Sequence, residues 1–223
     1  MQSRATRDRP ESDADRLINQ VVTLQLQPGS MYSENELADS IGCNRTKIRK
    51  LLQDVAPYGL LNALPRRGIL VAPIQPLDAS LVYEARIAIE THTARLAALR
   101  ATNRQLEDLA ELLQSQPHEA GPLGIADFLP GDSLLHLQIA GAAQNPMLQN
   151  CLAQLLPASS RLWYWSYETL NVVDRETLSH EEVVDAIVKR KSKEAEQAMA
   201  THLKASWQLL QRVISARWQV SIA

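Results

Sequence analysis

Asp132 and His136 lie four residues apart in the stretch DSLLHLQIAGAAQNPML, and both side chains are of types that bind metal ions. In a helix this spacing places both side chains on one face. The surrounding residues are apolar, small or amide-bearing, so we expect this face to be buried. Two interpretations are open at this point. The pair is either a helix-start aspartate followed by a hydrogen-bonded core histidine, or half of a metal site.

His180 and His202 could supply the other half. They lie in two consecutive expected helices, about equidistant from a turn expected near residue 191. Residues equidistant from the turn of an antiparallel helix pair lie at the same height, so the two imidazoles can face each other. Three helices could then bring four ligands together: Asp132, His136, His180 and His202. Three imidazoles and one carboxylate suit Zn, Ni, Mn or Fe better than Mg or Ca. Separate core and surface histidines are the alternative.

A different chemical pattern lies nearer the N-terminus, within residues 34–53. Apolar residues recur there where two short helices would pack together: Leu37, Ile41, Ile48 and Leu51. Ser33 and Glu36 have the spacing of a capping box at the start of the first helix. Gly42 suits the tight turn between the helices, and Asn44 suits the N-cap of the second. The pattern predicts a helix-turn-helix.

The helix after Asn44 is basic on its outward side. Residues 44–68 contain six basic residues and one acidic residue. Arginines near the start of such a helix can reach base edges in the major groove, and hydroxyl groups and helix N-termini suit phosphates. The apolar runs around PRRG, residues 65–68, predict a basic hairpin beside the helix. The predicted DNA-binding residues are Arg45, Thr46, Lys47, Arg49, Arg66 and Gly68. The alternative is an interaction module with a basic solvated face.

Other segments provide the elements that must position these residues. A first amphipathic helix is expected from residue 13 up to Pro28-Gly29. Beyond the hairpin, helices are expected over residues 78–100, 102–116, 132–144, 145–170, 179–190 and 192–218. We therefore predict a mostly α fold. It comprises an N-terminal winged helix-turn-helix of three helices and a β-hairpin wing (residues 1–74), a linker (residues 75–77), and an all-α helical bundle of six or seven helices (residues 78–223).

Bulk composition limits the class of protein. No apolar run approaches the length that spans a bilayer, and the polar N-terminus does not look like a signal peptide. Cys43 and Cys151 do not make a disulfide framework. The net charge of −2 conceals the local excess of positive charge in residues 44–68, which favours an anionic partner. We expect a cytoplasmic protein with no membrane partner.

The segment LQPGSMYSENELADSIGCNRTKIRKLLQDVAPYGLLNALPRRGILV resembles the winged helix-turn-helix of GntR-type bacterial transcription regulators. The resemblance implies that Arg45 and Arg49 read bases, that Thr46 helps to hold the DNA backbone, and that the wing near Gly68 enters the minor groove. Asn35 stands where relatives often carry a DNA-contacting arginine, so it is also predicted to contact DNA, and Lys50 replaces a usual glutamate. These departures bear on the operator sequence rather than on the fold.

The segments YEARIAIETHTARLAA, DSLLHLQIAGAAQNPML and SHEEVVDAIVKRKSKEAEQAMATHL together resemble the effector-binding FCD domain of the FadR branch. The resemblance implies a divalent metal bound by Asp132, His136, His180 and His202, and a small organic acid as effector. Arg86 is the best candidate to pair with a second carboxylate of the effector, and Arg161 is a weaker one. The alternative for Arg86 is a structural salt bridge with Glu90, one helical turn later.

The leading hypothesis is a metabolite-responsive, DNA-binding transcriptional regulator, expected to be a repressor, that binds a double-stranded operator as a homodimer. A metal-dependent enzyme acting on a small acid is a second hypothesis, since a metal with open positions activates water. No flanking acid or base supports it: Glu181 and Glu182 fit a helix start, with Ser179 and Glu182 at capping-box spacing. A third hypothesis is an interaction module without DNA binding. We predict a regulator and not an enzyme.

Overall fold

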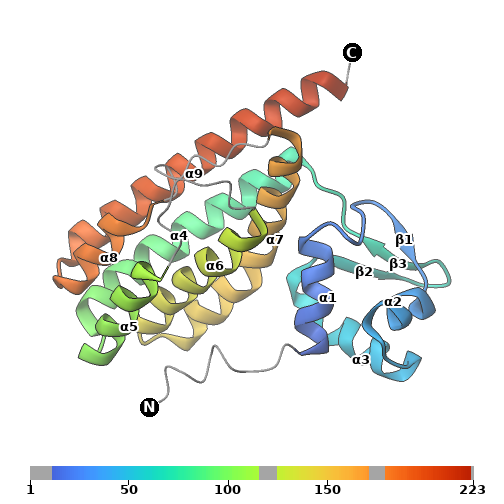
Figure 1. Ribbon diagram of the computed structural model, residues 1–223, viewed down its shortest axis with the longest axis horizontal. Coiled ribbons are helices and arrows are strands. Elements are labelled where there is room, and N and C mark those ends of the chain that lie inside the picture. Colours follow the sequence, from blue (N-terminus) through green and yellow to red (C-terminus); the bar gives the residue numbers. More distant parts are fainter. Residues whose placement is uncertain (1–11, 116–124, 171–178, 222–223) are drawn as a thin grey trace. The chain divides into compact units, whose positions relative to one another are not determined.

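The structure is a computed structural model, and the residues it describes are 12–115, 125–170 and 179–221. Its contacts divide the chain into two compact units, residues 1–75 and residues 76–223 (Figure 1). Pro76 and Leu77, which the sequence assigned to a linker, lie in the first turn of a long helix. Each unit is described below by itself.

The N-terminal unit combines three α-helices with a small sheet. Its elements are α1 (Asp13–Val22), β1 (Met31–Tyr32), α2 (Glu34–Ile41), α3 (Arg45–Val55), the 3-10 turn η1 (Ala56–Tyr58), β2 (Leu61–Leu64) and β3 (Gly68–Val71). The sheet is antiparallel in the order β1-β3-β2, with Leu70 opposite both Met31 and Asn62. This is the expected helix-turn-helix followed by a wing.

Local hydrogen bonds explain where these helices begin. Ser33 and Glu36 form the predicted capping box, in which the Ser33 hydroxyl accepts from the Glu36 backbone N–H and the Glu36 carboxylate accepts from that of Ser33. The side-chain oxygen of Asn44 accepts from the backbone N–H of Lys47 at the start of α3. Gly42 ends α2 with a φ of 73°, a left-handed conformation that glycine adopts without steric cost. The turn that sets α3 against α2 is therefore fixed by its sequence.

Two details of this unit differ from the prediction. The helix expected to reach Pro28-Gly29 ends at Val22, and Leu24 has a φ of 60°. Leu24 and Leu26 are each only 5% exposed, so the chain turns early and places both leucines in the core instead of continuing a helical stripe. The second difference is β1, a third strand that the hairpin prediction did not include. With only two residues, it is too short to show an alternating pattern.

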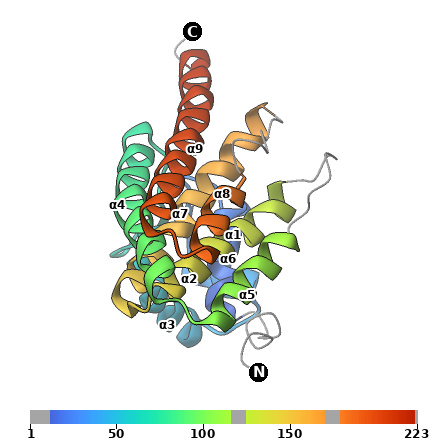
Figure 2. The same ribbon diagram turned by 90° about the vertical axis from the view of Figure 1, so that its left-hand side faces the viewer.

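The C-terminal unit is all-helical in the part of the chain that the structure describes. Its helices are α4 (Pro76–Arg100), α5 (Asn103–Gln114), α6 (Ile125–Ala142), α7 (Pro146–Leu170), α8 (Glu181–Val188) and α9 (Ser192–Ser221). These six helices confirm the predicted mostly α fold. The long helices α4 and α9 pack side by side, and α6 and α7 pack against α4 (Figures 1 and 2). The core is built mainly from Ala, Leu, Val and Ile side chains of α4, α5, α6, α8 and α9.

The start of α6 decides one of the open questions about Asp132. The helix begins at Ile125, so Asp132 lies inside it, two residues after Pro130, and is not a helix-start residue. A carboxylate in this position needs another explanation than capping.

No helix among the described residues is long and apolar enough to cross a membrane.

Candidate metal centre and DNA-binding face

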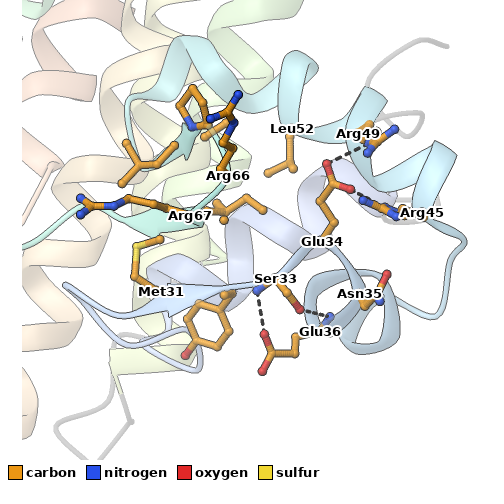
Figure 3. A pocket seen from close by; sticks show the side chains of 16 residues that line it. Met31, Ser33, Glu34, Asn35, Glu36, Arg45, Arg49, Leu52, Arg66 and Arg67 are labelled. Atoms are coloured by element: carbon orange, nitrogen blue, oxygen red, sulfur yellow. Dashed lines mark hydrogen bonds and ion pairs between the residues drawn. The ribbon is translucent and has the colours of Figure 1, made fainter.

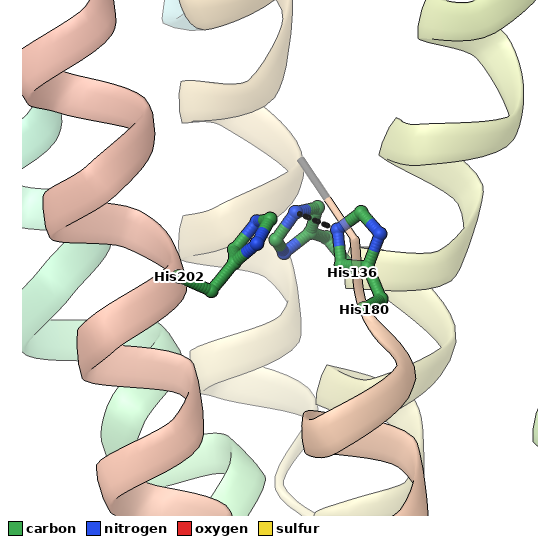
Figure 4. A group of neighbouring side chains, drawn as sticks. All are labelled: His136, His180 and His202. Atoms are coloured by element: carbon green, nitrogen blue, oxygen red, sulfur yellow. Dashed lines mark hydrogen bonds between the residues drawn. The ribbon is translucent and has the colours of Figure 1, made fainter. Parts of the chain in front are cut away.

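Three histidines from separate helices meet inside the C-terminal unit (Figure 4). His136 lies on α6, His180 is the N-cap residue of α8, and His202 lies on α9. Their possible ligand atoms all lie within 4.8 Å of one another, and all three side chains are buried. The ring centroids of His180 and His202 are 4.2 Å apart, as expected for residues equidistant from the turn between α8 and α9. The alternative of separate core and surface histidines is therefore wrong.

The spacing of the imidazole nitrogens fits a shared cation. Nε2 of His136 and Nε2 of His180 are 3.1 Å apart. Two nitrogens that each bind one metal at about 2.0–2.1 Å, at right or tetrahedral angles, lie roughly 2.9–3.4 Å from each other. Such a pair can share a proton as a hydrogen bond or can direct both lone pairs at one metal ion.

Hydrogen bonds on the outer side of the cluster favour Nε2 as the ligand atom. Nδ1 of His202 lies 3.1 Å from the backbone carbonyl of Ser179, which can only accept. Nδ1 of His136 lies against the Glu90 carboxylate, which is ionised. The Nδ1 atom of His202 therefore carries a proton, and its Nε2 atom is left with a lone pair. His136 turns Nδ1 toward the carboxylate and Nε2 toward His180. Metal-binding histidines show this arrangement of carboxylate or carbonyl partners.

Sequence reasoning named Glu90 only as a partner for Arg86 and missed its contact with His136. Glu90 and His136 are each 1% exposed. Burial would raise the pKa of Glu90, but the positive charge of Arg86, together with His136, outweighs this and lowers it. A glutamate in the apolar, alanine-rich face of α4 was the available signal, because such a residue is rarely buried without a partner.

Asp132 lies at the edge of the histidine cluster. Its Oδ1 atom is 3.4 Å from Nε2 of His180 and 3.8 Å from Nε2 of His136. The structure thus brings together all four residues that the sequence proposed as ligands. The side chain of Asp132 is 13% exposed, more than the histidines that it approaches.

Burial also sets the charge of the histidines. It lowers the pKa of both His180 and His202 well below the ordinary value, and the neighbouring His136 lowers them further. Both imidazoles are therefore neutral near pH 7, which is the form that binds a metal.

The two candidate effector-binding arginines are both buried in the same unit. Arg86 forms the ion pair with Glu90 that the sequence offered as an alternative, with Nε 2.6 Å from Oε1, and its Nη1 donates to Ser159 Oγ at 2.7 Å. Among the described residues, its Nη2 has no hydrogen-bond partner. Burial would lower the pKa of Arg86, but Glu90 raises it. Arg161 is 3% exposed, and burial lowers its pKa to about 10.

The capping box expected at Ser179 and Glu182 is wrong. His180 occupies the N-cap position of α8, and the Ser179 hydroxyl instead accepts from the backbone N–H of Glu181 at 3.3 Å. The backbone carbonyl of Ser179 contacts His202, so this residue helps to orient the histidine cluster instead of capping α8.

In the N-terminal unit, most of the predicted DNA-binding residues border a single hollow between α2, α3 and the wing (Figure 3). Its lining includes Asn35, Arg45, Arg49, Arg66 and Gly68, whereas Thr46 and Lys47 lie outside it. Arg45, Thr46, Lys47 and Arg49 are all exposed on α3. The four residues are thus presented to solvent at the start of one helix, as a recognition helix requires.

Three basic side chains of α3 form ion pairs with carboxylates of α1 and α2. Glu34, the first residue of α2, accepts from Nε of Arg45 at 2.5 Å and from Nε of Arg49 at 2.8 Å (Figure 3). Lys47 pairs with Asp13 at the start of α1. Sequence reasoning missed both partners, because nothing in the local spacing joins Glu34 or Asp13 to α3.

The wing turn has an unusual backbone. Arg66 has a φ of 62°, a left-handed conformation that residues other than glycine rarely adopt. Gly68 has a φ of 109°, and a Cβ atom there would lie 2.6 Å from the carbonyl oxygen of Tyr32 in the adjacent strand. Gly68 is therefore required by the packing of β3 against β1, whatever it contributes to DNA binding.

Comparison with known proteins agrees with this geometry. Residues 12–71 match the family model described as bacterial regulatory proteins, gntR family. Residues 81–205, more than half of the chain, match the FCD domain model.

Individual relatives extend over different parts of the chain. The Nta operon transcriptional regulator of Aminobacter aminovorans is 28% identical over 127 residues, which are 57% of this chain and 60% of that protein. The HTH-type transcriptional repressor RspR of Escherichia coli strain K12 is 26% identical over 188 residues, 84% of this chain and 82% of that protein. The solved structure of E. coli McbR/YncC has a similar fold, with a TM-score of 0.74 at 18% identity, covering 90% of this chain and 95% of that one.

The Nta operon regulator and RspR are named as transcriptional regulators, and the matched gntR model describes regulatory proteins, which supports the expectation that the chain is not an enzyme. The helix-turn-helix with its wing, the helical unit with its histidine cluster and both family matches lead to one assignment. The chain belongs to the GntR family of bacterial transcription regulators and carries an FCD domain.

Proposed function

We propose that this regulator is a homodimeric, cytoplasmic repressor whose helical unit binds a divalent transition metal and a small organic acid. The observation that carries the proposal is the meeting of three buried imidazoles with the Asp132 carboxylate. Four such ligands suit Zn, Ni, Mn or Fe and leave positions open on a metal that takes five or six. When bound, the metal would supply a Lewis-acidic position for a carboxylate oxygen.

The surroundings of the cluster support an anionic ligand. Arg86 is buried, and its charge lowers the pKa of both His180 and His202, so it lies close enough to act on the cluster. Its Nη2 atom has no hydrogen-bond partner among the described residues, although Nε and Nη1 are used. A buried guanidinium nitrogen without a partner is costly, and a carboxylate oxygen would satisfy it. We propose that Arg86 holds the far end of the acid, with Arg161 as a second candidate.

On the DNA side, we propose that Arg45 and Arg49 contact base edges, that Thr46 and Lys47 contact the phosphate backbone, and that the wing with Arg66 and Gly68 lies beside the groove. Asn35 borders the same hollow as the arginines and would contribute a neutral donor and acceptor. A homodimer would place two such faces on a pseudo-palindromic operator.

The decisive experiment is a DNA titration of the zinc-loaded, full-length protein with and without citrate or lactate, in wild type and in His136→Ala. The expected result is an acid-dependent change in DNA affinity of about 5–150-fold in wild type, corresponding to roughly 1–3 kcal/mol of coupling. In His136→Ala this response should vanish while DNA binding without acid persists. His92→Ala, which removes an exposed histidine of α4, is the matched control and should respond like wild type. An acid effect of equal size in His136→Ala would show that the cluster does not sense the acid.

A further inference from the structure

Glu34 occupies a special place on the DNA-binding face. It begins α2, directly after the capping residue Ser33. One of its carboxylate oxygens accepts from Arg45 and the other accepts from Arg49, so each oxygen has a partner on α3 (Figure 3). Its side chain is 26% exposed, whereas those of Arg45 and Arg49 are 62% and 57% exposed. The carboxylate therefore lies beneath two cations that are presented to solvent.

The spacing of the two arginines explains why a carboxylate is needed there. Arg45 and Arg49 are four residues apart on α3, which places them on the same face of the helix and makes their charges repel. Free arginine side chains in such positions would separate and sample many rotamers. Glu34 supplies the opposite charge between them and holds each guanidinium by its Nε atom.

We propose that Glu34 is a positioning residue that fixes both base-reading arginines before DNA arrives, and so determines sequence specificity. The inference rests on the proposed role of Arg45 and Arg49 at base edges. Because Glu34 uses only the Nε atoms, it leaves the terminal Nη1 and Nη2 atoms of each arginine available. Those two donors are enough for bidentate contact with O6 and N7 of guanine. The entropy cost of ordering the two long side chains is then met in the free protein rather than on binding.

The charge of Glu34 has a second effect. A carboxylate on the DNA-binding face repels phosphates, so it lowers the affinity for every duplex regardless of sequence. Glu34 would therefore increase the preference for the operator in two ways. It would weaken attraction to the phosphates of any duplex, and it would order the arginines that contact specific bases. Its removal should therefore raise affinity for unrelated DNA and reduce the preference for the operator. A carboxylate that only stabilised the fold would not produce these opposite changes.

The neighbouring carboxylates cannot perform this function. The Glu36 carboxylate is held by the backbone N–H of Ser33 in the capping box. Asp54 lies near the other end of α3 and is exposed. Asp54→Asn thus removes one negative charge from the same unit without touching the two arginines, and it serves as the matched control.

The test uses the full-length protein and two duplexes of equal length: one selected by the wild type from a randomised library, and a shuffled version of it. Glu34→Gln should bind the shuffled duplex more tightly than wild type does. Its preference for the selected duplex should fall at least about fivefold, the lower end of the loss expected for one arginine–base contact. Asp54→Asn should leave that preference unchanged. A preference in Glu34→Gln equal to that of wild type would overturn the proposal.

Three further variants separate the possible failures. Glu34→Asp keeps the charge but shortens the side chain, so it should lose preference without gaining affinity for the shuffled duplex. Arg45→Ala and Arg49→Ala test the role on which the proposal rests. If neither changes the preference, base reading by these arginines is wrong and the inference fails with it. If both reduce the preference while Glu34→Gln and Glu34→Asp keep it, only the positioning role fails.

Discussion

Glu90 of α4 and His136 of α6 are in direct contact, with the carboxylate Oε2 of Glu90 against Nδ1 of His136. Through its other oxygen, Glu90 holds Nε of Arg86 at 2.6 Å. One buried carboxylate therefore joins a proposed metal ligand to the proposed effector-binding cation. A change in the position of Arg86 on acid binding would reach His136 through a single side chain.

Glu90→Gln should weaken metal binding without removing any proposed ligand. The amide oxygen of glutamine is a poorer acceptor for Nδ1–H of His136 than a carboxylate is, so the imidazole is less firmly oriented and less basic. Loss of such a partner typically costs about 10–100-fold in metal affinity. Zinc titration against a competing chelator measures this, with Glu84→Gln, an exposed glutamate on the same helix, as the control. Equal zinc affinity in the two variants would contradict the positioning role.

Arg86→Met should destabilise the helical unit strongly, because it leaves the Glu90 carboxylate buried without its cation. Breaking a buried pair in this way costs about 3–5 kcal/mol of unfolding free energy. Removing the exposed Lys191, whose Nζ is 2.9 Å from Glu194, should cost less than about 1 kcal/mol. Denaturant unfolding of Arg86→Met and Lys191→Met compares them directly. Combining Arg86→Met with Glu90→Gln should restore part of the loss, and no recovery would argue against a charge-based cause.

Gly68→Ala should destabilise the N-terminal unit more than Gly29→Ala does. Both glycines have positive φ, 109° and 80°, so both substitutions strain the backbone. At Gly29 no atom lies within 4 Å of the added Cβ, and the strain alone costs about 1 kcal/mol. At Gly68 the Cβ would also collide with the carbonyl of Tyr32 and force β1 and β3 apart. Thermal unfolding should rank the variants in this order; a reversed order would show that the wing relaxes easily.

The pKa of Glu34 should be measurable by carboxyl NMR as a value of about 2, below the ordinary 4.5, because of the hydrogen bonds from Arg49 and Arg45. Since the folded pKa is depressed, this interaction stabilises the fold above about pH 4.5 and is lost as the pH falls toward 2. The double variant Arg45→Ala/Arg49→Ala should return the pKa to its ordinary range. A Glu34 that titrates near 4.5 in wild type would exclude a persistent contact in solution.

Lys47→Ala should weaken binding to all duplexes alike, unlike Arg45→Ala. Lys47 is exposed and pairs with Asp13, outside the hollow that holds the arginines. A phosphate contact carries no sequence information, so its loss should reduce the slope of affinity against salt by about 1 and leave preference intact. Titrations of the selected and shuffled duplexes at several salt concentrations measure both quantities. A change in preference would place Lys47 at the bases instead.

The histidine cluster was predictable because its spacing has a simple geometric meaning. His180 and His202 are equidistant from a turn, so antiparallel packing of α8 and α9 brings these two together. Asp132 and His136 are one helical turn apart on α6, so they share one face of that helix. The helix-turn-helix was predictable for a similar reason, since Ser33, Gly42 and Asn44 fix the starts and ends of its helices locally.

What escaped prediction depends on contacts between distant segments. The Glu90–His136 contact and the Glu34 contacts with α3 follow from how helices pack, and no local spacing encodes them. The early end of α1 could not be predicted because it depends on tertiary packing: ending the helix lets Leu24 and Leu26 be buried in the core. The place of Asp132 inside α6 was hidden by Pro130, which normally marks a helix start or break.

The left-handed conformation of Arg66 in the wing has a consequence for how this protein could be engineered or could evolve. Glycine would adopt the same φ without steric cost, so Arg66→Gly relieves backbone strain while it removes an exposed cation of the wing. On the proposed DNA-binding role of Arg66, this substitution would raise the stability of the wing and lower operator affinity at the same time. A thermostability screen that ignores DNA binding would favour glycine here and would select a protein that is more stable but, on this proposal, binds its operator less tightly.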